Sequence, residues 1–90
     1  MEIEEKKQIM LEKKEKVKKL MEKIDFGAMD WMPNGTLTFY KEYLDNGDDD
    51  KITFYIDDKG KLKTTIDICY EDLSVEEIVT LYKVVELLGF

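Results

Sequence analysis

The stretch KITFYIDDKGKLKTTIDICY, residues 51–70, decides the fold, because it holds two runs of alternating apolar and polar residues around one tight turn. A period of two is typical of strands that bury one face, and the β-branched and aromatic residues favour the strand conformation. We therefore predict strands at residues 51–57 and 61–70. The turn at residues 57–60 is short enough to join them as a hairpin.

A third strand is predicted at residues 36–44, after the Pro-Asn-Gly turn sequence at 33–35, which makes an antiparallel meander. A short fourth strand at residues 29–32 is a further option. Alternation assigns to the buried face Leu37, Phe39, Tyr43, Ile52, Phe54, Ile56, Leu62, Ile66, Ile68 and Tyr70. It assigns to the opposite face Thr38, Tyr40, Glu42, Thr53, Tyr55, Lys63, Thr65, Asp67 and Cys69.

Residues 2–24, ahead of the strands, are predicted to form one helix. Apolar residues recur every seven positions along it, at Ile3, Met10, Val17 and Ile24. Lysines interrupt the apolar face in the first half, so that half is expected to project beyond the core or fray. Gly27 follows the last apolar position and is the predicted stop of the helix.

A second helix is predicted from Ser74 to the C-terminal end of the sequence. Ser74 and Glu77 have the spacing of a capping box, and Leu73 and Ile78 that of a hydrophobic staple. The face expected to pack on the sheet consists of Ile78, Leu81, Tyr82, Val85 and Leu88. A second apolar side consists of Val79, Val84, Leu87 and Phe90, and would be buried against the first helix or in a homodimer. The whole chain, residues 1–90, is thus predicted to be one α+β domain in the order α-β-β-β-α.

The composition excludes several classes of function. All 14 basic residues are lysines, so the chain lacks the arginine that reads guanine edges and the histidine that titrates near neutral pH. The single cysteine, Cys69, has neither a disulfide partner nor a histidine to activate it. We predict a protein of the cytoplasm, of a bacterium or a phage-infected cell, that is not an enzyme and holds no cofactor. No run is apolar enough for a membrane span, and direct binding of nucleic acid is not expected.

The net charge of −7 is unevenly distributed along the chain. Residues 1–24 hold eight lysines and six acids, a net of +2, and residues 25–90 hold six lysines and fifteen acids, a net of −9. In a meander, the loop after the first strand and the exit of the third lie at one end of the sheet. Carboxylates from both stretches are predicted to converge there as a partner-binding edge: Asp45, Asp48, Asp49, Asp50, Glu71, Asp72, Glu76 and Glu77. Tyr40 and Tyr55 are predicted secondary contacts, and a merely solvated acidic face is the alternative.

Three other groups of residues suggest a site, and each has a simpler structural explanation. The acidic residues 45–50 lack the alternation and the twelfth-position glutamate of a calcium loop, so no metal site is predicted. Tyr40 and Tyr55 are poor platforms for nucleobases, because Asp67 is expected on the same face. Trp31, flanked by two methionines, is expected to plug one end of the core and not to serve as an exposed anchor.

The element order resembles that of double-stranded-RNA-binding domains, but Ser-Val-Glu-Glu at residues 74–77 stands where those domains present lysines to phosphate. In size, acidity and architecture, with the acid-rich stretch at residues 45–50, the chain is similar to phage-encoded inhibitors of bacterial defence, notably the anti-CRISPR proteins. Some of these mimic DNA. That resemblance implies that residues 45–50 and 71–77 fill the DNA-recognition groove of a nuclease.

The leading hypothesis from the sequence is therefore an acidic inhibitor that blocks the basic nucleic-acid-binding surface of a defence nuclease. The alternatives are an immunity protein or antitoxin that neutralises a basic toxin, and a homodimeric structural or interaction module. The homodimer would be held by the last helix or by a short coiled coil of the first.

Overall fold

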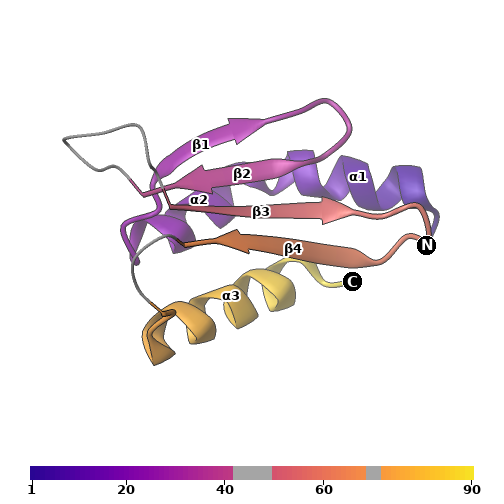
Figure 1. Ribbon diagram of the computed structural model, residues 1–90. Coiled ribbons are helices and arrows are strands. Elements are labelled where there is room, and N and C mark those ends of the chain that lie inside the picture. Colours follow the sequence, from indigo (N-terminus) through magenta and orange to yellow (C-terminus); the bar gives the residue numbers. More distant parts are fainter. Residues whose placement is uncertain (42–49, 69–71) are drawn as a thin grey trace.

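The computed structural model describes residues 1–41, 50–68 and 72–90. Figure 1 shows a four-stranded antiparallel sheet with α1 and α2 behind it and α3 alongside its β4 edge. The elements are α1 (Ile3–Glu12), α2 (Lys14–Glu22), β1 (Ala28–Trp31), β2 (Leu37–Tyr40), β3 (Lys51–Ile56), β4 (Leu62–Asp67) and α3 (Val75–Leu88). The α+β prediction is confirmed, and the optional fourth strand is present as β1.

The sheet buries the predicted face on β2 and β3. On β4 the prediction is wrong, because β4 is the edge strand and α3 packs on α2, which leaves Ile66 41% exposed and Leu62 only partly buried. Phe39 of β2 lies opposite Met29 of β1 and Ile52 of β3, and Ile52 lies opposite Ile66 of β4. Leu37, Phe39, Ile52 and Phe54 are fully or almost fully buried and form the centre of the core. Predicted positions that lie outside the described residues are Glu42, Tyr43, Cys69 and Tyr70.

The N-terminal segment differs from the predicted single helix. It divides at Lys13, whose backbone leaves the helical conformation while its Nζ donates a hydrogen bond of 2.8 Å to the carbonyl oxygen of Leu87. The first half neither projects nor frays, because Met10 is fully buried and Ile3 packs against the core. Its lysines lie beside the apolar stripe with their long aliphatic stems on the protein surface, which allows the helix to stay docked.

The turn after α2 corrects the prediction that Gly27 ends the helix. Asp25 adopts the left-handed conformation, with φ of 66°, and the amide of Phe26 donates to the carbonyl oxygen of Met21 at 3.0 Å. A short polar side chain tolerates this conformation better than most residues do. The turn directs Phe26, which is fully buried, into the core.

Phe26, which precedes β1, is buried in the core, whereas Trp31 at the other end of that strand is not. Trp31 is 51% exposed at the end of the edge strand β1, and Lys14 Nζ lies 5.3 Å from the centre of its ring. The prediction that Trp31 plugs the core is therefore wrong. Trp31 is the last residue of the edge strand β1, and the ammonium group of Lys14 from α2 lies over its ring.

The start of α3 confirms the predicted capping box. The Glu77 amide donates to Ser74 Oγ at 3.1 Å, and the Ser74 amide donates to Glu77 Oε1 at 2.9 Å. The predicted packing face of α3 is largely wrong, because Thr80, Val84 and Leu88 are buried while Ile78, Tyr82 and Val85 are exposed. The helix packs on α2 through its Thr80–Val84–Leu88 side, which rotates the other apolar stripe outward.

The β3–β4 turn is held by a carboxylate. Asp57 Oδ1 accepts hydrogen bonds from the amides of Lys61 at 2.8 Å and Lys59 at 2.9 Å. The bond from Lys61 is the main cause of a lowered pKa of Asp57, and the nearby charge of Lys63 adds to it. The ionised form is thus favoured in the folded state.

Asp57→Asn is expected to make the free energy of unfolding depend less on pH in the acidic range. Because the folded-state pKa is lowered, the Asp57 carboxylate stabilises the fold above its unfolded pKa of about 3.9, and this contribution is lost as the pH falls through the folded pKa. Urea unfolding of both proteins between neutral and strongly acidic pH should show midpoints that differ near pH 7 and converge in acid. A constant difference at all pH values would contradict a role for the charge.

Candidate functional site

The elements that carry the predicted binding edge meet at one end of the sheet. Tyr40 near the end of β2, Lys51 at the start of β3 and Asp67 at the end of β4 lie side by side in the strand register. Beyond Asp67 the chain turns into α3, whose N-terminal end lies at the same end of the molecule (Figure 1). We call Asp67, Asp72, Glu76 and Glu77 the acidic end.

Four of the predicted contact residues, Asp45, Asp48, Asp49 and Glu71, lie outside the described residues. The residues that flank them are described. The amide of Lys41 donates to the carbonyl oxygen of Asp50 at 2.9 Å, beside the Tyr40–Lys51 pair, and Ile68 follows Asp67. Segments 42–49 and 69–71 contain only acidic residues among their charged side chains, and both are anchored at the acidic end.

Asp50 differs from its predicted role as an exposed contact. Its side chain is 2% exposed and takes part in an interaction within the protein. A carboxylate at this depth loses most of its contact with solvent, and it persists in a fold only when a partner compensates for that loss. Asp50 therefore contributes to holding the start of β3 and not to the outer surface.

Asp72 and Glu76 present exposed carboxylates at the acidic end. Within the described ranges the ion pairs are Lys7–Glu4 and Lys18–Glu22, so neither carboxylate is neutralised by a lysine there. One carboxylate oxygen of Glu77 already accepts a hydrogen bond from the Ser74 amide in the capping box. Acids in the first turn of α3 also face the positive end of the helix dipole, which supplies a structural reason for their presence.

Tyr40 and Tyr55 lie on the sheet face opposite the core, as alternation predicts, and both are half-buried. Between them Thr53 Oγ1 lies 3.3 Å from Thr38 Oγ1, a cross-strand hydrogen bond on the same face. Tyr40 has an interaction within the protein, whereas Tyr55 lies opposite Lys63 at the far end of the strands. The two tyrosines are thus separated along the face, and Tyr40 is the one beside the acidic end.

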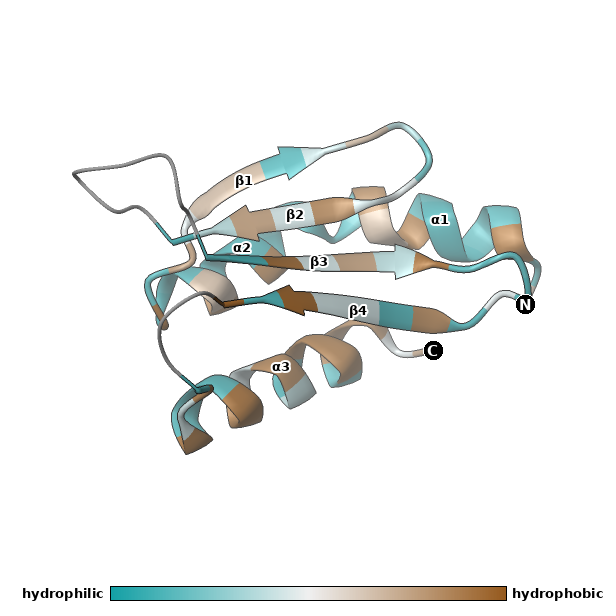
Figure 2. Ribbon diagram, in the orientation of Figure 1, coloured by the Kyte–Doolittle hydropathy of each residue, from teal (hydrophilic) through white to brown (hydrophobic). Residues whose placement is uncertain are grey.

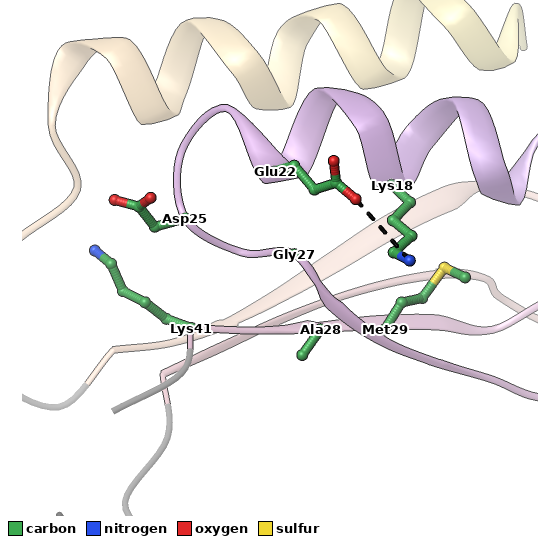
Figure 3. Close-up of a pocket in the computed structure, with 7 residues that line it drawn as sticks. All are labelled: Lys18, Glu22, Asp25, Gly27, Ala28, Met29 and Lys41. Atoms are coloured by element: carbon green, nitrogen blue, oxygen red, sulfur yellow. Dashed lines mark ion pairs between the residues drawn. The ribbon is translucent and has the colours of Figure 1, made fainter. Parts of the chain in front are cut away.

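A cleft of about 680 Å³ opens between α2, the turn after it and β1, near the acidic end (Figure 3). Lys18 and Glu22 on its α2 wall form an ion pair with Nζ and Oε1 3.9 Å apart, and Asp25 and Lys41 line its other side. Lys41 Nζ also lies 5.3 Å from the centre of the Phe26 ring. All of its lining residues except Lys41 come from the continuous stretch 18–29, and the fold brings Lys41 beside them.

The mixed charges of this cleft do not form a recognisable catalytic set. In the part of the chain that the structure describes, no three His, Cys, Asp or Glu side chains are placed to share a metal ion. Helices that are long and apolar enough to cross a membrane are likewise missing from the described ranges. Charge recognition by carboxylates is the chemistry that the described surface offers most directly.

The fold and this surface define a small two-layer α+β protein with an electronegative end. Comparison with protein-family models, curated protein sequences and solved structures finds no match for the chain.

Proposed function

We propose that this protein is a non-catalytic inhibitor that binds, through its acidic end, the basic nucleic-acid-binding groove of a defence nuclease in the cytoplasm. The single observation that carries the proposal is the convergence at one end of the sheet. Unpaired Asp72 and Glu76 lie at the end that also anchors segments 42–49 and 69–71, whose charged residues are all acidic. Carboxylates gathered in this way attract a cationic groove and repel nucleic acid.

The charge distribution supports a mode of binding based on phosphate mimicry. In the anti-CRISPR proteins that the chain resembles in size, charge and architecture, acidic side chains take the place of phosphates. The net of −9 over residues 25–90 is large for so small a body, while the lysine-rich helices α1 and α2 lie behind the sheet. Association with a basic groove would then be fast at low salt and weaken as added ions screen the charges.

Charge reversal at the acidic end tests this proposal. The assay is cleavage of duplex DNA by purified RNA-guided nucleases of bacterial defence systems, with the wild-type protein or its variants added. Asp72→Lys/Glu76→Lys is expected to weaken inhibition by about tenfold or more, since it places cations against a cationic groove. Excess duplex DNA should relieve inhibition by the wild-type protein, because both ligands occupy one groove.

The matched control is Glu2→Lys/Glu5→Lys, which makes the same change in net charge on exposed acids near the other end of the molecule. Ile3 lies against Gly60 of the β3–β4 turn, opposite the acidic end. Inhibition by the control should stay within a factor of about two of the wild-type value, because exposed charges beyond a Debye length act weakly. Equal losses in both variants, unchanged inhibition by Asp72→Lys/Glu76→Lys, or no inhibition of any nuclease by the wild type would overturn the proposal.

A further inference from the structure

An apolar surface is left open where α3 runs beside β4. Ile78 is 52% exposed and Tyr82 67% exposed, and Val85 and Ile66 are exposed beside them. Ile78, Tyr82 and Val85 line a groove of about 270 Å³ together with Phe54, Leu62 and Leu81. Figure 2 shows hydrophobic residues spread along almost the whole of α3. We call Ile66, Ile78, Tyr82 and Val85 the α3–β4 surface; large apolar side chains gathered in this way usually mark an interaction site.

The helical spacing explains why this surface faces outward. Ile78, Tyr82 and Val85 recur at i, i+4 and i+7 and form one stripe along α3. Thr80, Val84 and Leu88 form the neighbouring stripe, which is buried. Because α3 packs on α2 through the buried stripe, the exposed stripe points past the edge of the sheet on the β4 side.

β4 is an edge strand of the sheet, and among the described residues one row of its backbone groups has no strand partner. The amide of Asp57 donates to Lys61 O at 2.9 Å at the start of the β3–β4 hairpin, and hydrogen-bonded pairs alternate along an antiparallel ladder. The backbone groups of Lys63, Thr65 and Asp67 therefore face β3. Those of Leu62, Thr64 and Ile66 are directed out of the sheet. β4 is six residues long, and an exposed strand edge of this kind can pair with a further strand.

The charges of β4 identify a strand that fits this edge. Lys63 and Asp67 lie on the same face, each two residues from Thr65. An antiparallel copy of β4, placed with Thr65 opposite Thr65, brings Lys63 of each strand opposite Asp67 of the other. Thr64 then lies opposite Ile66, with the free backbone groups of both strands in the positions of hydrogen-bonded pairs.

We propose that the α3–β4 surface and the β4 edge bind a second copy of this chain, in a two-fold dimer with one continuous eight-stranded sheet. The apolar stripes of the two α3 helices meet across the axis on the core side of the sheet. A shift by two residues in one direction sets Asp67 opposite Thr65 and leaves Lys63 without an acidic partner within β4. The same shift in the other direction sets Lys63 opposite Thr65 and moves Asp67 opposite Lys61, which precedes β4. A shift by one residue places the two apolar faces on opposite sides.

The proposed dimer contact includes Asp67 of the acidic end but not Asp72 or Glu76, the two carboxylates on which the inhibitor proposal rests. Antiparallel pairing directs the exits of the two β4 strands toward opposite ends of the joined sheet. The test of dimerisation uses the protein alone, so its result does not depend on whether the protein inhibits a nuclease.

Analytical ultracentrifugation of the full chain between about 1 and 100 μM tests the dimer and its register, across the range of typical weak to moderate protein association. The wild-type protein is expected to reach twice the mass of the chain at the higher concentrations. Lys63→Asp and Asp67→Lys each place like charges opposite one another twice per dimer, and each should raise the dissociation constant by about tenfold or more. The double variant Lys63→Asp/Asp67→Lys restores opposite charges and should recover most of the wild-type affinity.

A cysteine at the symmetry axis provides a second measurement. In a Cys69→Ser background, Thr65→Cys places two thiols on directly opposite residues with Cα atoms about 4.5 Å apart, within the range of a disulfide. Mild oxidation should give a covalent dimer, while Lys59→Cys in the exposed β3–β4 turn should give little. A monomeric wild type at 100 μM with intact circular dichroism overturns the proposal. If the wild type dimerises but the charge variants at residues 63 and 67 leave its dissociation constant unchanged, and no cross-link forms at residue 65, this register is wrong.

Discussion

Phe39→Ala is expected to lower the free energy of unfolding by about 3–5 kcal/mol. Phe39 is fully buried at the centre of β2, and its ring lies edge-on to that of Phe54, with centroids 6.1 Å apart and an angle of 71° between the planes. Truncation removes the buried apolar area and this ring contact, and leaves a cavity between the sheet and the helices. Small domains have only about 5–15 kcal/mol of stability in total, so the variant should be close to unfolding at room temperature.

Urea unfolding followed by far-ultraviolet circular dichroism measures this effect. Phe90→Ala is the matched control, because Phe90 is a half-buried aromatic residue at the edge of the core and not at its centre. The control should lose clearly less stability than Phe39→Ala. If the two variants lose similar amounts, the core is not centred on the β2–β3 pair as the structure places it.

Gly35→Ala is expected to destabilise the fold by about 2–4 kcal/mol, through strain and steric conflict together. Gly35 lies in the β1–β2 turn with φ of +91°, a conformation that side-chain-bearing residues rarely adopt. A Cβ atom built there would lie 2.9 Å from the carbonyl oxygen of Lys7 and 3.0 Å from its Cα. These are backbone atoms of α1, so relief of the clash requires a shift of the whole helix away from the sheet.

Gly89→Ala separates the two contributions to this loss. Gly89 also has a positive φ, of 76°, but a Cβ atom built there has nothing within 4 Å. That variant should show only the conformational cost, about 1–2 kcal/mol. Equal losses of stability at the two positions would mean that α1 does not pack as closely on the β1–β2 turn as described.

The sequence predicts the position and exposure of the acidic end only in part. The convergence of the β2 exit and the β4 exit follows from the meander, so the general place of the acidic end could be predicted. The accessibility of each carboxylate could not. Asp50 is buried while Asp72 and Glu76 are exposed, although all three are acids in polar stretches next to strands or helices.

The errors at Trp31 and along α3 have a common origin. Sequence periodicity identifies apolar stripes but not what lies opposite them. In α3 two apolar stripes lie next to each other. The stripe centred on Val84 is buried against α2, and the stripe that contains Tyr82 is left exposed. At β1 alternation places Trp31 on the core side, opposite Leu37, but at the end of an edge strand it is 51% exposed beside Lys14 of α2.

The sequence by itself determined the elements that depend on neighbours along the chain: the alternating strands around residues 57–60, the capping box of Ser74 and Glu77, and the charge asymmetry between residues 1–24 and 25–90. Only the tertiary structure decided which stripe of α3 is buried, that α1 docks on the sheet, and that β4 is left as an open edge. Local hydrogen bonds and side-chain periodicity act within a few residues, whereas burial depends on segments that are distant along the chain and compete for the same apolar surface.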